Sequence, residues 1–175
     1  RVAQVDPAEA DRTGGRVVTV EPWNARVITV SDGVAAGARE DRGGLAVRDA
    51  LVAAGAAVDR MVVSTDGVDA VEAALNEACA GFHGLVVTTG GTGFGPRDLT
   101  PEGTLAVITR QAPGLAEAMR LVNPLGRLSR GVAGSVDRAL VLNVPGSPKG
   151  AVECLDAVLD VVPHALDLLG GDTAH

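Results

Sequence analysis

The chain has 175 residues, a formal net charge of −7 and no basic run, which argues against nucleic acid as a partner. Its length fits one domain with a substantial core, which Ala, Val and Leu should fill because only 2% of the residues are aromatic. No apolar run approaches the roughly 20 residues that span a bilayer, and no secretory leader is visible, so we expect a cytoplasmic protein without a membrane partner.

Strand and helix patterns alternate from residue 25 onward. Residues 1–24 contain a glycine pair, a proline and several charges without helical periodicity, so we expect a flexible N-terminal extension in which 17–20 fits an edge strand. The domain itself is expected to cover 25–175. We predict strands at 27–30, 58–63, 85–88 and 139–144, helices near 47–54, 68–78, 100–110 and 115–121, and a short hairpin within 125–138.

A last helix is predicted after the final strand. Apolar residues recur at steps of three and four from Val152 to Leu169, which marks one buried stripe, and Pro163 should kink or divide the helix within it. The strands are apolar on both faces and are separated by helices. This pattern predicts an α/β fold with a parallel sheet that helices cover on both sides.

A glycine-rich loop is the most informative segment. It follows a buried strand, holds four glycines within residues 90–95, and precedes the helix-start signal Thr100-Pro101-Glu102. Glycines let a backbone turn through positive φ and approach a ligand closely, so that its amides converge on an anion. Arg97 adds a permanent cation and Asp98 a candidate metal ligand. The loop is therefore typical of a site for a phosphorylated substrate.

Four polar loops follow predicted parallel strands and should gather at one edge of the sheet. They are Ser31-Asp32, Thr65-Asp66, the glycine loop and Pro145 to Lys149. Together they supply carboxylates, cations and many small hydrogen-bond donors, which are the groups that phosphoryl or nucleotidyl transfer requires. Lys149 is the only lysine in the chain. That indicates either a requirement for a compact ammonium group or a solvated residue retained by chance.

Each candidate acid also has a purely structural interpretation. Asp98 precedes a helix and is able to cap it, but Thr100 fits the cap with Pro101 at the first helical position, which frees Asp98 for another role. Asp66 precedes a helix as well, so N-capping competes with a catalytic role. Asp32 is likewise a candidate cap.

Other patterns carry less weight. Ser129-Arg130 lies in a polar loop, where an arginine either contacts a ligand or is solvated. The chain has no Gly-x-Ser-x-Gly elbow, no Walker A motif and no dinucleotide spacing of glycines. The three histidines lie far apart, which argues against a metal cluster. Cys79 and Cys154 fall in apolar helical patterns, so we expect two buried free thiols.

The loop at 88–102, T-T-G-G-T-G-x-x-P-R-D-x-T-P-E, resembles the signature of the Mog/MoaB family of molybdenum-cofactor biosynthesis, which includes a domain of gephyrin. Further segments match in the family's order, and the resemblance covers roughly 25–170. These segments are Val30-Ser31-Asp32, Gly37, Asp41-x-Gly43, Pro113-Gly114, Leu128-Ser129-Arg130 and Asn143 to Lys149.

The resemblance implies a three-layer αβα fold with a mostly parallel sheet, assembly as a homotrimer or larger homo-oligomer, and molybdopterin adenylyltransferase activity. Such an enzyme transfers AMP from Mg-ATP to molybdopterin, releases pyrophosphate and passes its product to a molybdate-insertion enzyme. Asp66 and Asp98 would be the catalytic acids and the ligands of Mg²⁺. Substrate or phosphate binding is expected of Ser31, Asp32, Thr89, Gly90, Gly91, Thr92, Gly93, Arg97, Ser129, Arg130, Pro145, Gly146, Ser147 and Lys149.

The chain departs from the family pattern after two strands. Gly33 stands where an arginine is frequent, which weakens anion binding there unless Arg39 or Arg42 substitutes. Asp66 is kept without the proline that commonly precedes it. Two other functions stay open, a non-catalytic pterin-binding MoaB-like paralogue or scaffold and a CinA-type domain. The CinA motif Gly-Gly-Leu-Gly-Pro-Thr-x-Asp-Asp differs from the loop seen in this chain.

Overall fold

The computed structural model of the chain describes residues 22–171. The edge strand expected at 17–20 lies outside the described residues, and the division between an extension at 1–24 and a domain at 25–175 stays a prediction. Among the described helices, none combines the length and apolar character that crossing a membrane requires.

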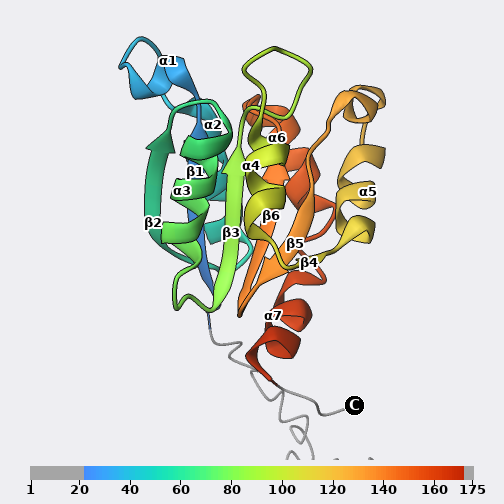
Figure 1. Ribbon diagram of the computed structural model, residues 1–175. Helices are drawn as coiled ribbons and strands as arrows, with labels where there is room; N and C mark the ends of the chain where they lie inside the picture. The colour runs from blue at the N-terminus through green and yellow to red at the C-terminus, as the bar shows by residue number, and fades with distance from the viewer. Residues whose placement is uncertain (1–21, 172–175) are drawn as a thin grey trace, which may run out of the picture.

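A six-stranded, mostly parallel sheet forms the middle of the molecule, as the sequence predicted (Figure 1). Its strand order is β2-β1-β3-β6-β5-β4, in which β2, β1, β3 and β6 run parallel while β5 and β4 are antiparallel. The strands are β1 (Asn24–Val30), β2 (Ala57–Ser64), β3 (Gly84–Thr89), β4 (Arg110–Gln111), β5 (Ala133–Val136) and β6 (Ala139–Val144).

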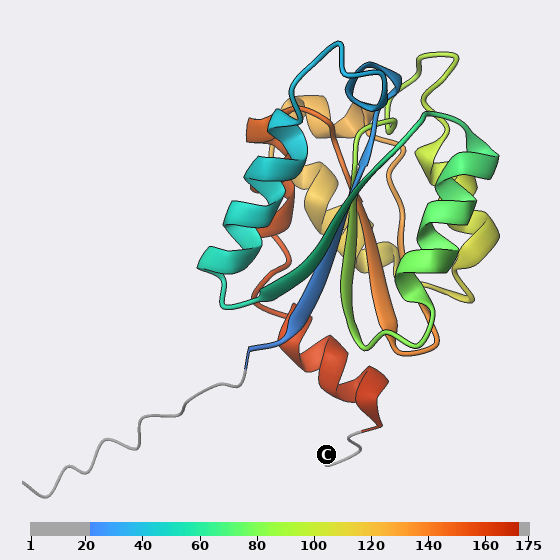
Figure 2. The ribbon, with the colours of Figure 1, turned by 90° about the vertical axis from the view of Figure 1, so that its left-hand side faces the viewer.

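Helices cover both faces of the sheet and complete three layers (Figure 2). One face carries α2, α5 and α6, and the other carries the packed pair α3 and α4. The helices are α1 (Asp32–Ala35), α2 (Arg42–Ala53), α3 (Val68–Cys79), α4 (Thr100–Val107), α5 (Pro113–Leu121), the 3₁₀ turn η1 (Pro124–Leu128), α6 (Pro148–Asp156) and α7 (Val162–Gly170).

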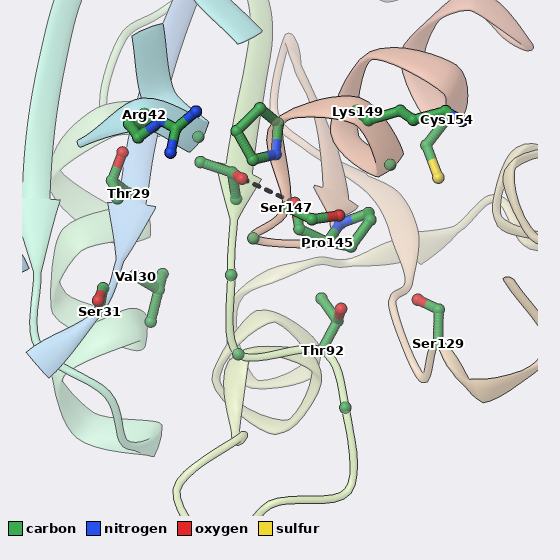
Figure 3. Close-up of a pocket in the computed structure, with 18 of the residues that line it drawn as sticks. Thr29, Val30, Ser31, Arg42, Thr92, Ser129, Pro145, Ser147, Lys149 and Cys154 are labelled. Atoms are coloured by element: carbon green, nitrogen blue, oxygen red, sulfur yellow. Dashed lines mark hydrogen bonds between the residues drawn. The ribbon is translucent and has the colours of Figure 1, made fainter. Parts of the chain in front are cut away.

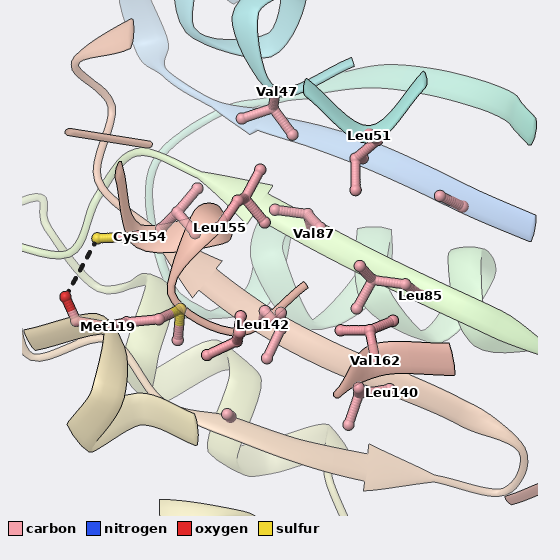
Figure 4. Packing of buried hydrophobic residues seen from close by; sticks show 14 of the residues in the cluster. Val47, Leu51, Leu85, Val87, Met119, Leu140, Leu142, Cys154, Leu155 and Val162 are labelled. Carbon is pink, nitrogen blue, oxygen red and sulfur yellow. Dashed lines mark hydrogen bonds between the residues drawn. The ribbon is translucent and has the colours of Figure 1, made fainter. Parts of the chain in front are cut away.

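Two apolar cores lie between these layers because successive side chains of a strand point to opposite faces. On β3, Leu85 and Val87 face the core beneath α2 and α6, where Leu51 and Leu155 meet them (Figure 4). Val86 faces the other core, beneath α3 and α4. Each fully buried side chain of this size contributes about 1.5–3 kcal/mol. Small aliphatic residues thus hold the layers together, as the composition predicted.

Several details differ from the predicted elements. No hairpin lies within 125–138, since that part of the chain holds η1 and β5, and β5 pairs with β4 and β6. The helix that begins at Thr100 ends at Val107 and not near 110, because Arg110 and Gln111 pair with β5 as strand β4. Thr100 is not the N-cap of α4, which is Leu99; the Thr100 hydroxyl instead donates to the carbonyl of Gly90 at 2.9 Å. The C-terminal stripe is divided as predicted, but the break falls at 157–161, with Pro163 in the first turn of α7. Proline fits that position because its missing N–H has no helical acceptor there.

The two cysteines are buried and free, as predicted. Burial raises the pKa of the Cys79 thiol to about 11 and also raises the pKa of Cys154. Both thiols therefore stay protonated at neutral pH, where only the thiolate would be reactive.

A buried polar network links β6 to its neighbours. Asn143 Nδ2 donates to Thr88 Oγ1 at 2.8 Å and to Thr104 Oγ1 at 2.9 Å, while Asn143 Oδ1 accepts from the amide of Val132 at 3.1 Å. Thr104 in turn donates to the carbonyl of Thr100 at 2.7 Å. The side chain of Asn143 thus holds β3, α4 and the chain before β5 in one arrangement.

Replacing Asn143 with alanine should lower the free energy of unfolding by about 2–4 kcal/mol, because it leaves the Val132 amide and the Thr88 hydroxyl buried without that partner. Urea denaturation followed by circular dichroism measures the change. The exposed Asn76 of α3 is the matched control, and Asn76→Ala should stay within about 0.5 kcal/mol of the wild type. Equal effects of the two substitutions would contradict the structural role of this network.

Candidate functional site

A cavity of about 1240 Å³ opens at the carboxyl edge of the parallel strands. Loops after β1, β2, β3 and β6 form its walls, together with the first residues of α2 and α6 and with η1 (Figure 3). The prediction that these loops gather at one edge is therefore confirmed. The volume lies just above the roughly 300–1,000 Å³ of a typical small-molecule site.

Most of the predicted site residues line this cavity. They are Ser31, Asp66, Thr89, Gly90, Gly91, Thr92, Gly93, Asp98, Ser129, Pro145, Gly146, Ser147 and Lys149. Three others, Asp32, Arg97 and Arg130, are not part of its lining and make contacts within the protein instead.

Asp32 and Asp66 bind each other's backbone. The Asp32 amide donates to Asp66 Oδ2 at 2.8 Å, and the Asp66 amide donates to Asp32 Oδ1 at 3.0 Å. Neither residue caps a helix through its side chain, since the caps of α1 and α3 are Ser31 and Gly67. This reciprocal pair fixes the loop after β1 against the loop after β2.

Arg97 joins the glycine loop to the same pair. Its guanidinium donates to both carboxylate oxygens of Asp32 at 3.1 Å and to the carbonyl of Asp66 at 2.8 Å. The sequence predicted that Arg97 binds an anion, but its guanidinium already makes these three hydrogen bonds within the protein. Its observed contacts position the loop that carries Asp98.

The turn at the start of the glycine loop depends on residues without a side chain. Gly90 and Gly91 have φ values of +106° and +62°, and a Cβ on Gly90 would lie 2.3 Å from the carbonyl oxygen of Val30. An L side chain would be strained at both positions. The glycines therefore let β3 turn tightly along the floor of the cavity.

Asp98 closes the same loop and does not cap α4. Its Oδ2 accepts from the Gly95 amide at 2.8 Å. Within residues 22–171, no donor reaches Asp98 Oδ1 or Asp66 Oδ1. A Cβ on Gly91 would lie 3.4 Å from Asp66 Oδ1, so the Asp66 carboxylate faces the glycine loop. Each acid thus keeps one carboxylate oxygen available to a ligand.

These two oxygens suit a hard cation. Mg²⁺ prefers oxygen ligands and usually binds proteins through one or two carboxylates together with water and substrate phosphates. The described part of the chain contains no group of three or more acidic, His or Cys side chains able to hold a metal alone. The free oxygens of Asp66 and Asp98 are thus of the chemical type that Mg²⁺ accepts beside water and phosphate.

Three cations line the cavity: Arg39, Arg42 and Lys149. The Lys149 side chain is 88% exposed, and its Nζ lies 3.7 Å from Glu153 Oε1, one turn further along α6. That weak ion pair leaves the ammonium free to reach a ligand. Ser147 caps α6 without using its hydroxyl for the cap, so that group is also available to a ligand.

Arg130 connects the glycine loop to α4 through its guanidinium. Its guanidinium donates to the carbonyl of Gly93 at 2.7 Å, to the carbonyl of Asp98 and to Glu102 Oε1 on α4. The hydrogen bond from Arg130 holds the pKa of Glu102 below its ordinary value of 4.5. Glu102 therefore stays charged at neutral pH and keeps the guanidinium in place.

Sequence reasoning did not identify every part of the wall. Asn123 to Gly126 and Leu128, in and beside η1, line the cavity, as do Glu153 and Cys154 of α6. The only local signal for the first group is the turn-forming Asn123-Pro124 pair. Nothing in the helical pattern of α6 distinguishes residues that face a ligand from those that face solvent.

Replacing Arg130 with glutamine should loosen the glycine loop, because three bonds from a charged donor are lost or weakened. Hydrogen exchange at residues 93–98 should become roughly tenfold faster while β3 keeps its protection. The matched control is Arg127→Gln, which alters an exposed arginine on η1. If both variants exchange like the wild type, Arg130 does not determine the loop's conformation.

Comparison with known proteins identifies several similar sequences and structures. Residues 26–164 match the family model described as a probable molybdopterin binding domain. The molybdopterin adenylyltransferase of Helicobacter pylori (strain J99) is 37% identical over 153 residues, which are 83% of this chain and 87% of that protein.

Solved structures agree with this match. The crystal structure of the molybdopterin biosynthesis enzyme MoaB from Thermus thermophilus has a TM-score of 0.80 and 44% identity, covering 86% of this chain and 98% of its own. The Mog protein of Mycobacterium ulcerans has a TM-score of 0.77 and 39% identity, covering 84% and 99%. The protein CinA of Thermoplasma acidophilum is only 23% identical at a TM-score of 0.65, covering 81% and 99%, so that likeness concerns the fold alone.

Proposed function

The chain belongs to the family of probable molybdopterin binding domains, and we propose that it is a molybdopterin adenylyltransferase of molybdenum cofactor biosynthesis. One observation carries the proposal. Asp66 and Asp98 each present a free carboxylate oxygen to a single cavity, whose floor is the glycine loop. The Helicobacter pylori relative that bears this activity in its name supports it.

The substrates are molybdopterin, which carries a terminal phosphate, and Mg-ATP. An oxygen of the molybdopterin phosphate attacks the α-phosphorus of ATP; that P–O bond forms as the bond to the β-phosphate oxygen breaks, and pyrophosphate leaves with the electron pair. When bound, Mg²⁺ neutralises charge on the phosphates. Asp66 and Asp98 are the residues that would hold it.

The remaining groups bring two polyanions together against their mutual repulsion. Backbone amides of the glycine loop and the free hydroxyl of Ser147 donate to phosphate oxygens. Lys149 and Arg42 neutralise charge from the opposite wall, where α2 and α6 begin. The backbone amides of the glycine loop are held in place before the substrates arrive, so little reorganisation of these donors is needed when charge develops in the transition state.

A non-catalytic pterin-binding MoaB-like paralogue is the second candidate. The similarity to the MoaB structure of Thermus thermophilus does not separate it from the enzyme. The two acids facing one cavity favour catalysis, because a protein that only binds the pterin has no use for a metal-binding carboxylate pair. A CinA-type domain is disfavoured by the loop itself, whose Thr92 and Pro96-Arg97-Asp98 depart from the motif Gly-Gly-Leu-Gly-Pro-Thr-x-Asp-Asp of that family.

We further propose that the chain assembles as a homotrimer or larger homo-oligomer in the cytoplasm and passes its product to a molybdate-insertion enzyme. Large apolar side chains support an assembly: Leu121 is 78% exposed and Val122 next to it is exposed, and Leu125 and Leu128, which also line the cavity, are exposed as well. A monomer in water gains nothing from exposing such a patch.

Substituting Asp98 with asparagine should lower the turnover number by roughly 100-fold or more, because a charged metal ligand is lost while size and the bond from Gly95 are kept. Pyrophosphate release measures turnover, and titration calorimetry with molybdopterin should show unchanged affinity. Asp69→Asn, which alters an exposed acid on α3, serves as the control and should keep wild-type turnover. Full turnover in Asp98→Asn would remove this residue from the mechanism.

Binding of ATP should depend on Mg²⁺. Titration calorimetry of the wild type should show at least roughly tenfold tighter ATP binding with Mg²⁺ than with EDTA, because the two acids otherwise repel the phosphates. The Asp66→Asn/Asp98→Asn double variant should lose that difference. A non-catalytic pterin-binding protein predicts no metal-dependent ATP binding in any variant.

A further inference from the structure

We propose that Arg39 is a phosphate-binding residue of the cavity, and that its guanidinium occupies space which exists only because residue 33 is glycine. The inference rests on the proposed function, because it assigns Arg39 to a phosphate group of one of the two substrates. It concerns a segment that follows α1, outside the glycine loop.

The chain between α1 and α2 folds back over α1 and delivers Arg39 to the cavity. Gly37 makes the turn, with a φ of +69° and its amide on the carbonyl of Val34 at 2.9 Å. The amides of Ala38 and Arg39 then both donate to the carbonyl of Gly33, at 2.9 and 3.1 Å. The backbone of Arg39 is thereby fixed beside Gly33.

The side chain of Arg39 lies directly over Gly33. A Cβ on residue 33 would come to 2.6 Å from Arg39 Nε, closer than real Cβ atoms approach, and to 3.2 Å from Arg39 Cζ, so the guanidinium would have to shift. Arg39 Nη2 also donates to Ser31 Oγ at 3.0 Å. The guanidinium is therefore held between the Ser31 hydroxyl and the bare backbone of Gly33, at the wall of the cavity.

Arg39 is available to a ligand, whereas five other arginines of the described chain are paired with acids. Arg26, Arg48, Arg60, Arg97 and Arg130 each pair with a carboxylate. Among residues 22–171, no carboxylate pairs with Arg39, and Ser31 uses only one of its five N–H donors. The nearby Asp41 carboxylate is occupied by Thr29 and the amide of Gly44.

A planar guanidinium with free donors matches the geometry of phosphate oxygens, which it binds through two parallel hydrogen bonds. Both substrates carry phosphate, so the ligand group is either the polyphosphate of ATP or the terminal phosphate of molybdopterin. The two sources are distinguished by measuring the affinity for each substrate separately.

Gly33→Ala offers a test that leaves Arg39 itself unchanged. Gly33 lies in α1 and has no positive φ, so alanine is compatible with its backbone. The added methyl group conflicts only with the flexible side chain of Arg39, which has to move away from Ser31. If the position of the guanidinium matters, Gly33→Ala and Arg39→Ala should cause the same defect.

The experiment measures the dissociation constants of Mg-ATP, AMP and molybdopterin by titration calorimetry for the wild type, Arg39→Ala, Gly33→Ala and the double variant. Arg39→Ala should weaken one phosphate ligand by roughly tenfold, and Gly33→Ala should weaken the same ligand. The double variant should be no weaker than Arg39→Ala. A loss for Mg-ATP without a loss for AMP would assign Arg39 to the β- or γ-phosphate of ATP. A loss for molybdopterin would assign it to the pterin phosphate.

Arg48→Ala, which removes an exposed arginine that pairs with Asp49 on α2, controls for the change in net charge and should bind like the wild type. Unchanged affinities in Arg39→Ala, or a Gly33→Ala defect that persists in the Arg39→Ala background, would overturn the inference. Failure of the proposed function has a different signature: the wild type would bind ligands without releasing pyrophosphate.

Discussion

The site depends on a chain of buried hydrogen bonds that ties the glycine loop to the sheet. Asn143 on β6 donates to Thr104 on α4, Thr104 donates to the carbonyl of Thr100, and Thr100 donates to the carbonyl of Gly90. All four residues except Gly90 belong to regular elements, and buried polar groups must find partners. The first turn of the loop therefore cannot move without leaving a buried polar group unpaired. These hydrogen bonds fix the floor of the cavity to the sheet.

Charged residues divide into those that shape the site and those that face the ligand. Arg97 and Arg130 are bound to Asp32 and Glu102, at the outer side of the loop. Such partly exposed pairs contribute little to overall stability. Their importance is positional, because each guanidinium also holds a backbone carbonyl of the segments that carry Asp66 or Asp98.

The sequence was sufficient to predict the sheet and the place of the site. Strands that are apolar on both faces must be covered on both sides, and parallel strands deliver their following loops to one edge, so the strand pattern alone places Asp66 and Lys149 around one site. The same reasoning failed for Thr100 as a helix cap, and it did not reveal the contacts that Arg97 makes. A threonine before proline is a good helix cap, but its hydroxyl can equally bond to a distant carbonyl. Arg97 pairs with an acid 65 positions away, and only the folded chain shows that proximity. The sequence shows which charged and polar side chains are present, whereas tertiary contacts decide which of them remain free to bind a ligand.

Because some charged residues shape the site and others face the ligand, acids and arginines can lie around one site without neutralising each other. Backbone amides, from Gly95 and Asp32, hold the carboxylates of Asp98 and Asp66, and no arginine side chain bonds to either carboxylate among the described residues. An amide orients a carboxylate while leaving its charge in place, whereas a guanidinium would neutralise it and compete with a cation for the same oxygens. Arg97 approaches within reach of this pair but binds the Asp32 carboxylate and the Asp66 carbonyl. Under the proposed function, this arrangement puts negative charge beside the metal and positive charge on the walls that face the phosphates, which is the polarity that nucleotidyl transfer requires.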